Sequence, residues 1–130
     1  MSDRLDVRKT YKLYIGGAFP RSESGRSYEV SGHDGSFLAN AVRASRKDLR
    51  DAVRAARKAW PEWAGLTAYN RGQVLYRIAE MMESRRADLV SEVARGEGGD
   101  AAGQVEEAID TWVWYAGWTD KLAQTLGGLN

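Results

Sequence analysis

The sequence of 130 residues contains no cysteine, one histidine and only two prolines. Without cysteine, the chain has no disulfide bond, no thiolate metal ligand and no thiol nucleophile of its own. The single histidine, His33, leaves no His-based metal site and no catalytic triad that this chain assembles alone. Its place in the polar stretch GHDG favours a turn. We therefore expect the chain to carry no catalytic and no metal-binding residue.

Net charge and long apolar runs are also missing. The 19 Lys and Arg residues nearly balance the 18 Asp and Glu residues, and the formal net charge of +1 gives no bulk attraction to nucleic acid or to an anionic membrane. The charged start, MSDRLDVRKTYK, holds neither a secretory signal nor a membrane span. We expect a cytoplasmic protein without membrane contact, built as one domain with a modest core.

Alternating apolar residues predict short strands between about residue 11 and residue 44. The stretch YKLYIGGAF alternates and then turns at Gly16 and Gly17, which predicts a small antiparallel hairpin. The polar stretch SGHDGS separates two further short strands, SYEV and FLANAVRAS. The sequence therefore predicts about four strands in its first third.

After residue 44, apolar residues recur every three or four positions, which predicts helices over about 45–126. Ser45 and Asp48 resemble a capping box at the first helix, and Pro61 is expected to end that helix. Thr67 and Asp100 are the next expected N-caps. The order of strands first and helices afterwards predicts an α+β fold rather than a self-contained doubly wound parallel sheet.

The long middle helical stretch is expected to break. Doubled arginines interrupt its apolar pattern, so two helices should meet within Ser84–Asp88, and the glycines of GEGG should end the second of them. The total is then three to four helices.

The last helical segment is unusually rich in aromatic residues. DTWVWYAGWTDKLAQ, residues 110–124, holds three of the five tryptophans, namely Trp112, Trp114 and Trp118. A surface helix normally has an apolar arc of roughly 100°, but here aromatic residues lie most of the way round. We expect these three tryptophans to form an interface with another surface.

A glycine-rich stretch before the last helix, GEGGDA, formally matches the dinucleotide pattern G-x-G-x-x-G/A. That pattern requires a preceding strand, whereas a helix is expected here. Glu97 and Asp100 would also repel a pyrophosphate. We interpret the stretch as a helix end, and we expect no cofactor to bind this chain alone.

Basic residues follow the first predicted helix, with Trp60 and Trp63 at its end. The basic residues are Arg43, Arg46, Lys47, Arg50, Arg54, Arg57 and Lys58. Basic and aromatic residues together can form a groove for single-stranded nucleic acid. Asp48 and Asp51 are placed to neutralise part of the charge, so a solvated helix face is the favoured interpretation.

Four further polar residues are candidate site residues, namely Glu106, Glu107, Asp110 and Arg71. Glu106 and Asp110 lie four apart on one helix face, but nothing nearby raises a carboxyl pKa, which favours a solvated pair. Arg71 is either an anchor for buried carbonyl groups or a surface charge, and the sequence leaves both interpretations open.

Four segments together suggest a known family. YIGGAFPRSESGRSYEV contains an aromatic-rich I-G-G-x-[FW] hairpin that leads to an E-V strand. LRDAVRAARKAWPEWAG contains the run A-V-x-x-A-R-x-A-[FW] followed by x-x-W. In AYNRGQVLYRIAEMMESRRADL, an arginine precedes a leucine-rich stripe, and E-x-R-x-x-[ED]-L ends the segment. VEEAIDTWVWYAGWTDKL contains the pattern [YF]-x-A-G-[WL]-x-[DE]-K. In this order, over about Tyr11 to Leu126, the segments resemble the N-terminal part of the NAD(P)-dependent aldehyde dehydrogenase superfamily.

The resemblance implies an incomplete part of an aldehyde dehydrogenase-like α/β fold. Residues 1–130 would be a single segment from the N-terminal part of the cofactor-binding domain. Members of the family oxidise aldehydes with NAD or NADP, using a cysteine thiolate and a glutamate that activates water. Because this chain has no cysteine, we expect it to be inactive alone and to have a structural role. Its expected partner is the remainder of the dehydrogenase, and the aldehyde would bind only the full-length form.

The resemblance also places residues near the substrate. In the family, the first turns of the helix that carries YAGW line part of the aldehyde entrance. Counting back from YAGW puts Gly103 and Glu107 at such positions, with Thr111 one turn further on. An acidic Glu107 would suit a polar aldehyde better than a fatty one.

An alternative function belongs to a different class. The chain could be a stand-alone interaction or oligomerisation module, in which the three tryptophans of the last helix bind a protein partner or a second copy.

Overall fold

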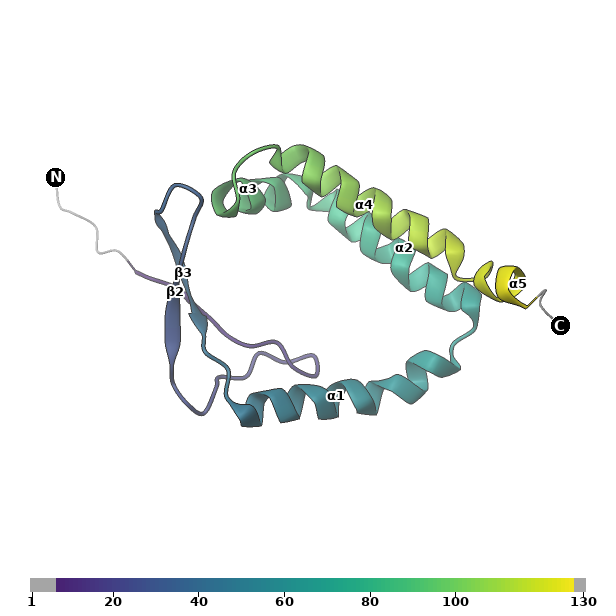
Figure 1. Cartoon of the computed structure of the whole chain (residues 1–130), viewed down its shortest axis with the longest axis horizontal. Helices are drawn as coiled ribbons and strands as arrows, with labels where there is room; N and C mark the ends of the chain where they lie inside the picture. The colour runs from purple at the N-terminus through teal and green to yellow at the C-terminus, as the bar shows by residue number, and fades with distance from the viewer. Residues whose placement is uncertain (1–6, 128–130) are drawn as a thin grey trace. The chain divides into compact units, whose positions relative to one another are not determined.

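The computed structural model describes residues 7–127, and the chain divides into two compact units, Met1–Pro61 and Glu62–Asn130. Within the described residues, three strands precede five helices (Figure 1). This order confirms the α+β class that the sequence predicts. The two units are described separately below.

The first unit contains a three-stranded sheet. Its strands are β1 (Thr10–Tyr11), β2 (Ser27–Ser31) and β3 (Phe37–Val42). The central strand β3 pairs in parallel with β1 and antiparallel with β2, which gives the order β1-β3-β2. The turn between β2 and β3 contains His33, as expected, and Ala39 of β3 is buried.

The predicted hairpin around the two glycines is reduced to one bridge. Gly16 and Gly17 have φ angles of 60° and 81°, the left-handed conformation that a tight two-residue turn requires. Ile15 and Ala18 exchange backbone hydrogen bonds of 3.0 and 3.1 Å. Pro20 cannot donate to a ladder, so the pairing ends there. The prediction of about four strands is therefore wrong, because β1 pairs with β3 instead of a hairpin partner.

Helix α1 (Arg46–Gly65) begins with the predicted capping box. The Ser45 N–H donates to Asp48 Oδ2 at 2.7 Å, and the Asp48 N–H donates to Ser45 Oγ at 3.3 Å. The Ser22 hydroxyl, from the loop before β2, also donates to Asp48 Oδ2 at 2.6 Å. Both Ser22 and Asp48 are buried. Asp48 therefore ties this loop to the start of α1, a link that the sequence did not reveal.

The Asp48 carboxylate should make the stability of the first unit acid-sensitive. The hydrogen bond from Ser22 and that from the Ser45 backbone hold the pKa of Asp48 below its ordinary value of 3.8. A lowered folded pKa stabilises the fold above the unfolded pKa, and this contribution is lost as the pH falls through the folded pKa. We expect Asp48→Asn to be less stable than the unchanged chain at about pH 7, with a difference that shrinks below about pH 4.

Urea unfolding at a series of pH values measures this difference. Asp110→Asn, which changes an exposed carboxylate on the last long helix, is the control and should show no such loss. A stability difference for Asp48→Asn that stays constant down to about pH 2.5 would contradict the assigned role.

Pro61 does not end α1 as predicted. The helix runs on to Gly65 with Pro61 inside it. A proline removes one intrahelical donor, but the residues after it still donate to earlier carbonyl groups. The boundary between the two compact units falls directly after Pro61.

Arg71 binds the carbonyl groups that follow this point. Its Nη1 donates to the Leu66 carbonyl at 2.6 Å and to the Ala64 carbonyl at 3.4 Å. Carbonyl groups at a helix end lack intrahelical partners, and an arginine is well suited to bind them. The structure therefore decides the open question in favour of the carbonyl anchor.

The second unit consists of helices. They are α2 (Ala68–Ser84), α3 (Arg86–Gly96), α4 (Ala101–Trp118) and α5 (Leu122–Leu126). Thr67 and Asp100 cap α2 and α4 as predicted, accepting from the Asn70 and Gly103 N–H groups at 3.2 and 2.9 Å. The predicted break between α2 and α3 is confirmed. The last helix divides into α4 and the short α5, one helix more than the sequence predicts.

The core of the second unit lies where α4 runs alongside α2 and meets α3 (Figure 1). Ala79, Val105 and Ile109 are its buried residues. Partly buried side chains pack round them: Met82, Leu89, Val90, Val93 and Trp112. This core is small: five hydrophobic residues are buried within residues 7–127, and one of them, Ala39, belongs to the first unit. Within that same range, no helix is both long and apolar enough to cross a membrane.

Candidate functional site

The three predicted entrance residues lie together on the outer face of α4. Gly103, Glu107 and Thr111 are spaced by four, which places them along one side of a helix. They line one open hollow of about 590 Å³ together with Trp114 and Tyr115. The Thr111 hydroxyl donates to the Glu107 carbonyl at 2.7 Å, so it is engaged within the helix. The Glu107 carboxylate is exposed.

Gly103 also has a local reason to be glycine. A Cβ at this position would collide with the carboxylate of Asp100, which caps the helix by accepting the Gly103 N–H. The absence of a side chain therefore allows the cap and, at the same time, leaves the start of the hollow wide.

The three predicted interface tryptophans divide into two groups. Trp112 is half-buried and packs against the core of its own unit. Trp114 is 63% exposed, and its ring lies 6.0 Å from the ring of the half-buried Trp118, tilted by 52°. Trp114 and Trp118 thus form an aromatic pair on the outside of α4, beside the hollow.

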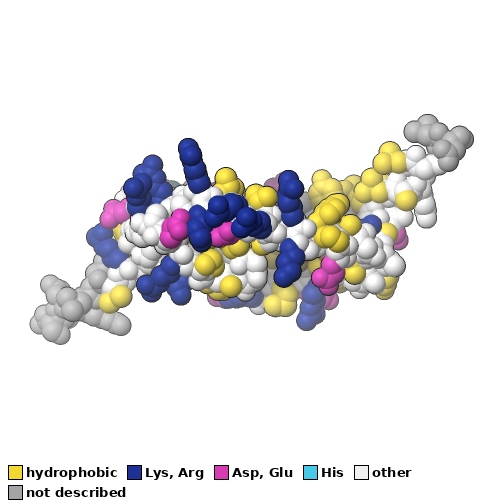
Figure 2. All heavy atoms as spheres, turned by 90° about the horizontal axis from the view of Figure 1, so that it is seen from below, with side chains coloured by type: hydrophobic (Ala, Val, Ile, Leu, Met, Phe, Trp, Pro, Cys, Tyr) yellow, Lys and Arg dark blue, Asp and Glu magenta, His cyan; other side chains and the backbone are white. Residues whose placement is uncertain are grey.

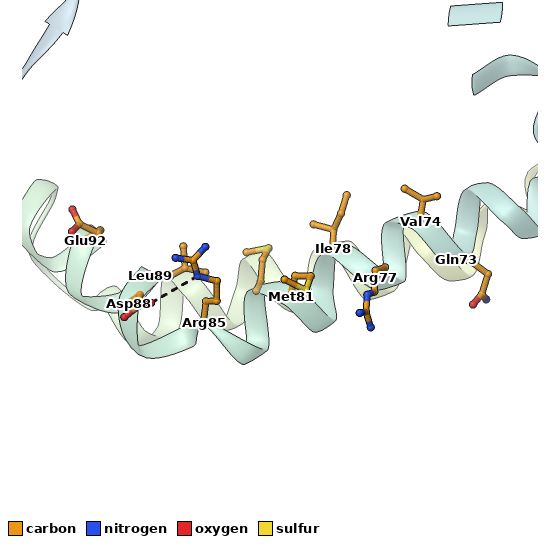
Figure 3. A pocket seen from close by; sticks show the side chains of 10 residues that line it. Gln73, Val74, Arg77, Ile78, Met81, Arg85, Asp88, Leu89 and Glu92 are labelled. Carbon is orange, nitrogen blue, oxygen red and sulfur yellow. Dashed lines mark ion pairs between the residues drawn. The ribbon is translucent and has the colours of Figure 1, made fainter. Parts of the chain in front are cut away.

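A second apolar surface was not predicted. Between α2 and α3 lies an open groove of about 740 Å³, shown in Figure 3. Its apolar wall is made by Val74, Ile78, Met81, Met82 and Leu89. Figure 3 shows Val74 and Ile78 projecting from one side of α2, with charged and polar side chains at the margins. We call this surface the α2–α3 groove.

Helix α2 therefore presents two apolar faces. One face contains Gly72, Ala79 and Met82 and contacts α4. The other face contains Val74, Ile78 and Met81 and lines the groove. The sequence pattern alone did not separate these two faces. The sequence does contain a signal for two faces. Val74 with Ile78, and Leu75 with Ala79, form two adjacent i, i+4 pairs, and together they make an apolar arc wider than one core contact needs.

The groove carries charges at one end. Arg85 and Asp88 approach each other to 3.8 Å there, and Arg77 pairs with Glu80 at 2.9 Å. These pairs are exposed, so they contribute little to stability. They nevertheless give the apolar groove a polar margin, as is usual at protein interfaces.

The basic residues predicted on the first helix remain a solvated face. Figure 2 views the molecule from the α1 side and shows Lys and Arg side chains gathered there, with acidic side chains among them. Lys47 pairs with Asp51 at 3.0 Å, and this hydrogen bond raises the pKa of the lysine. Arg50 lies 3.9 Å from the same carboxylate. These pairs support the interpretation that the sequence analysis favoured.

The remaining candidate carboxylates, Glu106 and Asp110, have different surroundings. Glu106 is joined to Arg86 in an ion pair between α4 and α3, while Asp110 is exposed. Over residues 7–127, no group of three or more His, Cys, Asp or Glu side chains has the arrangement of a metal site. The chemistry that these surfaces offer is the binding of apolar and aromatic groups.

The sequence model of the aldehyde dehydrogenase family matches residues 19–128. The chain belongs to the aldehyde dehydrogenase family. It corresponds to an N-terminal segment of that superfamily, as the four sequence motifs predicted. This aldehyde dehydrogenase segment is an incomplete part of the fold, because the solved relatives below extend well beyond it.

Three relatives illustrate the similarity. The cytosolic 10-formyltetrahydrofolate dehydrogenase of Mus musculus is 32% identical over 126 residues, which are 92% of this chain and 14% of that protein. PnpE from Pseudomonas sp. WBC-3 has a TM-score of 0.81 and 30% identity over 86% of this chain and 24% of its own. An NAD-dependent aldehyde dehydrogenase from Sinorhizobium meliloti has a TM-score of 0.78 and 25% identity, over 86% of this chain and 24% of its own.

These relatives are much longer than the segment. It spans between 14% and 24% of their lengths. PnpE has also been solved in complex with nicotinamide adenine dinucleotide, so NAD is a cofactor within the family. The activity, cofactor and partners of a whole enzyme therefore belong to the proposal that follows.

Proposed function

We propose that this aldehyde dehydrogenase segment forms the N-terminal layer of the cofactor-binding domain in an enzyme that oxidises an aldehyde to a carboxylic acid with NAD or NADP. The segment supplies no catalytic group. Its role is to support the cofactor domain and to form one wall of the substrate entrance. The remainder of the dehydrogenase is its partner. We place the enzyme in the cytoplasm, because the named relatives include a cytosolic enzyme.

The observation that carries this proposal is the second apolar face of α2. A helix at the surface of a complete domain needs one apolar face, whereas α2 has one face on α4 and another in the open α2–α3 groove. An apolar helix face that packs against no other element is usually covered by another part of the protein or by a partner. The length of the solved relatives supplies such a cover, since the segment spans 24% of PnpE.

Two further surfaces support the same conclusion. Leu49, Val53 and Trp60 share one face of α1 by their helical spacing, and all three are exposed. Trp114 and Tyr115 are exposed on the outside of α4. The helices of both units therefore carry apolar faces that the described residues do not bury.

We propose that the hollow on α4 lies at the substrate entrance. Gly103 leaves space at its start, the Glu107 carboxylate faces solvent, and Trp114 and Tyr115 add an apolar wall. A carboxylate beside aromatic rings favours an aldehyde that carries hydroxyl or amino groups over a long alkyl chain. Glu107 is thus the proposed specificity residue, with Gly103 and Thr111 as its neighbours.

The mass of the native protein tests the main proposal. We expect the protein captured from its source cells, with an antibody raised against this segment, to have an intact mass several-fold above the 14.4 kDa of the chain. The captured protein should reduce NAD or NADP when an aldehyde is added. A native mass near 14.4 kDa, with no associated dehydrogenase, would overturn the proposal.

The exposed aromatic pair on α4 favours a second candidate function, in which the segment binds a protein partner or a second copy. In that case Trp114→Ala should weaken self-association about tenfold, because exposed tryptophans are typical interface anchors. Trp60→Ala is the matched control, since Trp60 on α1 is 65% exposed and Trp114 is 63% exposed. Sedimentation velocity measures the association. A monomer at every concentration, or equal effects of both substitutions, would rule this function out.

A further inference from the structure

The first unit contains a basic hollow that neither the family match nor the proposed function explains. Its volume is about 360 Å³, and it lies between the sheet and the loop that precedes β2. Strand β1 contributes Thr10 and strand β2 contributes Ser27. The three charged side chains at its wall are all cations, namely Lys12, Arg21 and Arg26.

These cations have no acidic partner within the described residues. Neither guanidinium, Arg21 or Arg26, makes an ion pair or side-chain hydrogen bond within residues 7–127, and the same holds for Lys12. Elsewhere in the first unit, Arg8 pairs with Glu29 and Lys47 pairs with Asp51. The hollow brings together three cations that make no ion pair within residues 7–127.

The backbone that carries the two arginines is held in place. Ser22, which lies between the two arginines in the sequence, is buried, and its hydroxyl donates to Asp48. The Gly25 N–H donates to the Ser22 carbonyl at 3.3 Å, and Gly25 has a φ angle of 62°. The Arg26 carbonyl accepts from the Arg43 N–H at 2.9 Å. Because the loop is fixed on both sides, its backbone loses little conformational entropy when a ligand binds.

Two carboxylates lie near this loop and reduce its positive potential. Glu23 is exposed in the loop itself. Asp48 lies behind Ser22, where it accepts hydrogen bonds from Ser22 and Ser45. Neither carboxylate lines the hollow. Three cations and two hydroxyl groups remain available to an anion there.

We propose that this hollow binds the phosphate group of a small molecule. A guanidinium presents two parallel N–H donors that match two phosphate oxygens, so Arg21 and Arg26 would hold the phosphate and Lys12 would add a point charge. The hydroxyl groups of Thr10 and Ser27 complete the donor set. A hollow of about 360 Å³ is at the small end of ligand sites and accommodates a phosphate with a short attached group.

Calorimetric titration of the full chain with pyrophosphate, and separately with inorganic phosphate, tests this site. We expect saturable binding of pyrophosphate that weakens about tenfold in Arg21→Ala and in Arg26→Ala, and that the double variant abolishes. Arg57→Ala, the same change at an exposed residue of α1, is the matched control and should leave the affinity unchanged. Circular dichroism should show the same helix content in all variants, because neither guanidinium has a side-chain partner among residues 7–127.

Three results would overturn the proposal. Binding that does not saturate would indicate an adventitious ion only. An equal loss in Arg57→Ala would indicate a general effect of net charge. Binding of a single-stranded oligonucleotide that depends on Arg21, without any binding of pyrophosphate, would assign the surface to nucleic acid instead.

Discussion

Gly72→Ala should lower the free energy of unfolding of the helical unit by about 1–3 kcal/mol, although alanine is the better helix former. Gly72 is buried on the face of α2 that contacts α4. A Cβ there would lie 2.5 Å from Thr119 Oγ1 and 3.0 Å from the Ala116 carbonyl oxygen. The threonine side chain can rotate, but the carbonyl belongs to the α4 backbone. The two helices must therefore separate slightly, which loosens the contact along their length.

Two variants make this prediction specific. Gly96→Ala introduces the same group into α3, where a Cβ meets nothing within 4 Å, and should be neutral or stabilising by up to about 1 kcal/mol. Adding Thr119→Ala to Gly72→Ala removes the nearer contact and should restore part of the loss. Urea unfolding followed by circular dichroism measures all three. Equal stabilities of the Gly72→Ala and Gly96→Ala chains would show that α2 and α4 are not closely packed.

Val105→Ala should cost about 2–3 kcal/mol of the stability of the same unit. Val105 on α4 is 4% exposed and belongs to the core with Ala79 and Ile109. The substitution removes two buried methyl groups and leaves a cavity that the surrounding helices fill only in part. In so small a core few other contacts compensate, so the loss is a large fraction of the total stability.

The control for Val105 is another valine on the same helix. Val113 is 41% exposed, so Val113→Ala removes the same atoms from a site that water already reaches. We expect its effect to stay within about 0.5 kcal/mol. Urea midpoints of the two variants, measured side by side, give the comparison. Similar midpoints would mean that α4 does not bury the face on which Val105 lies.

Helix beginnings were predictable because their signals are local. The Ser45, Thr67 and Asp100 caps each bind an N–H group three residues further along the chain, so residue type and spacing contain the whole interaction. The end of α1 was not predictable in the same way. Pro61 removes one hydrogen bond, and whether a helix continues beyond it depends on the contacts of the following turn.

The candidate site was predicted only in part. The spacing of Gly103, Glu107 and Thr111 fixed their common helix face, and the structure places them in one hollow. The α2–α3 groove and the basic hollow were missed, because each is formed by residues whose proximity depends on how separate elements pack. The tryptophans illustrate the same limit. Trp112 and Trp114 are two residues apart, yet one packs on the core and the other is exposed.

The order of strands and helices, the helix caps, the lack of a thiol nucleophile and the family of the segment follow from the amino-acid sequence alone. These properties depend on residue identity and on spacings of a few residues. The packing of the folded chain settles which apolar faces are buried, which carbonyl groups Arg71 binds and where Lys12, Arg21 and Arg26 come together. The burial of a side chain and the pairing of a charge depend on residues that are close in space but far apart in the chain. A local sequence pattern therefore does not predict them.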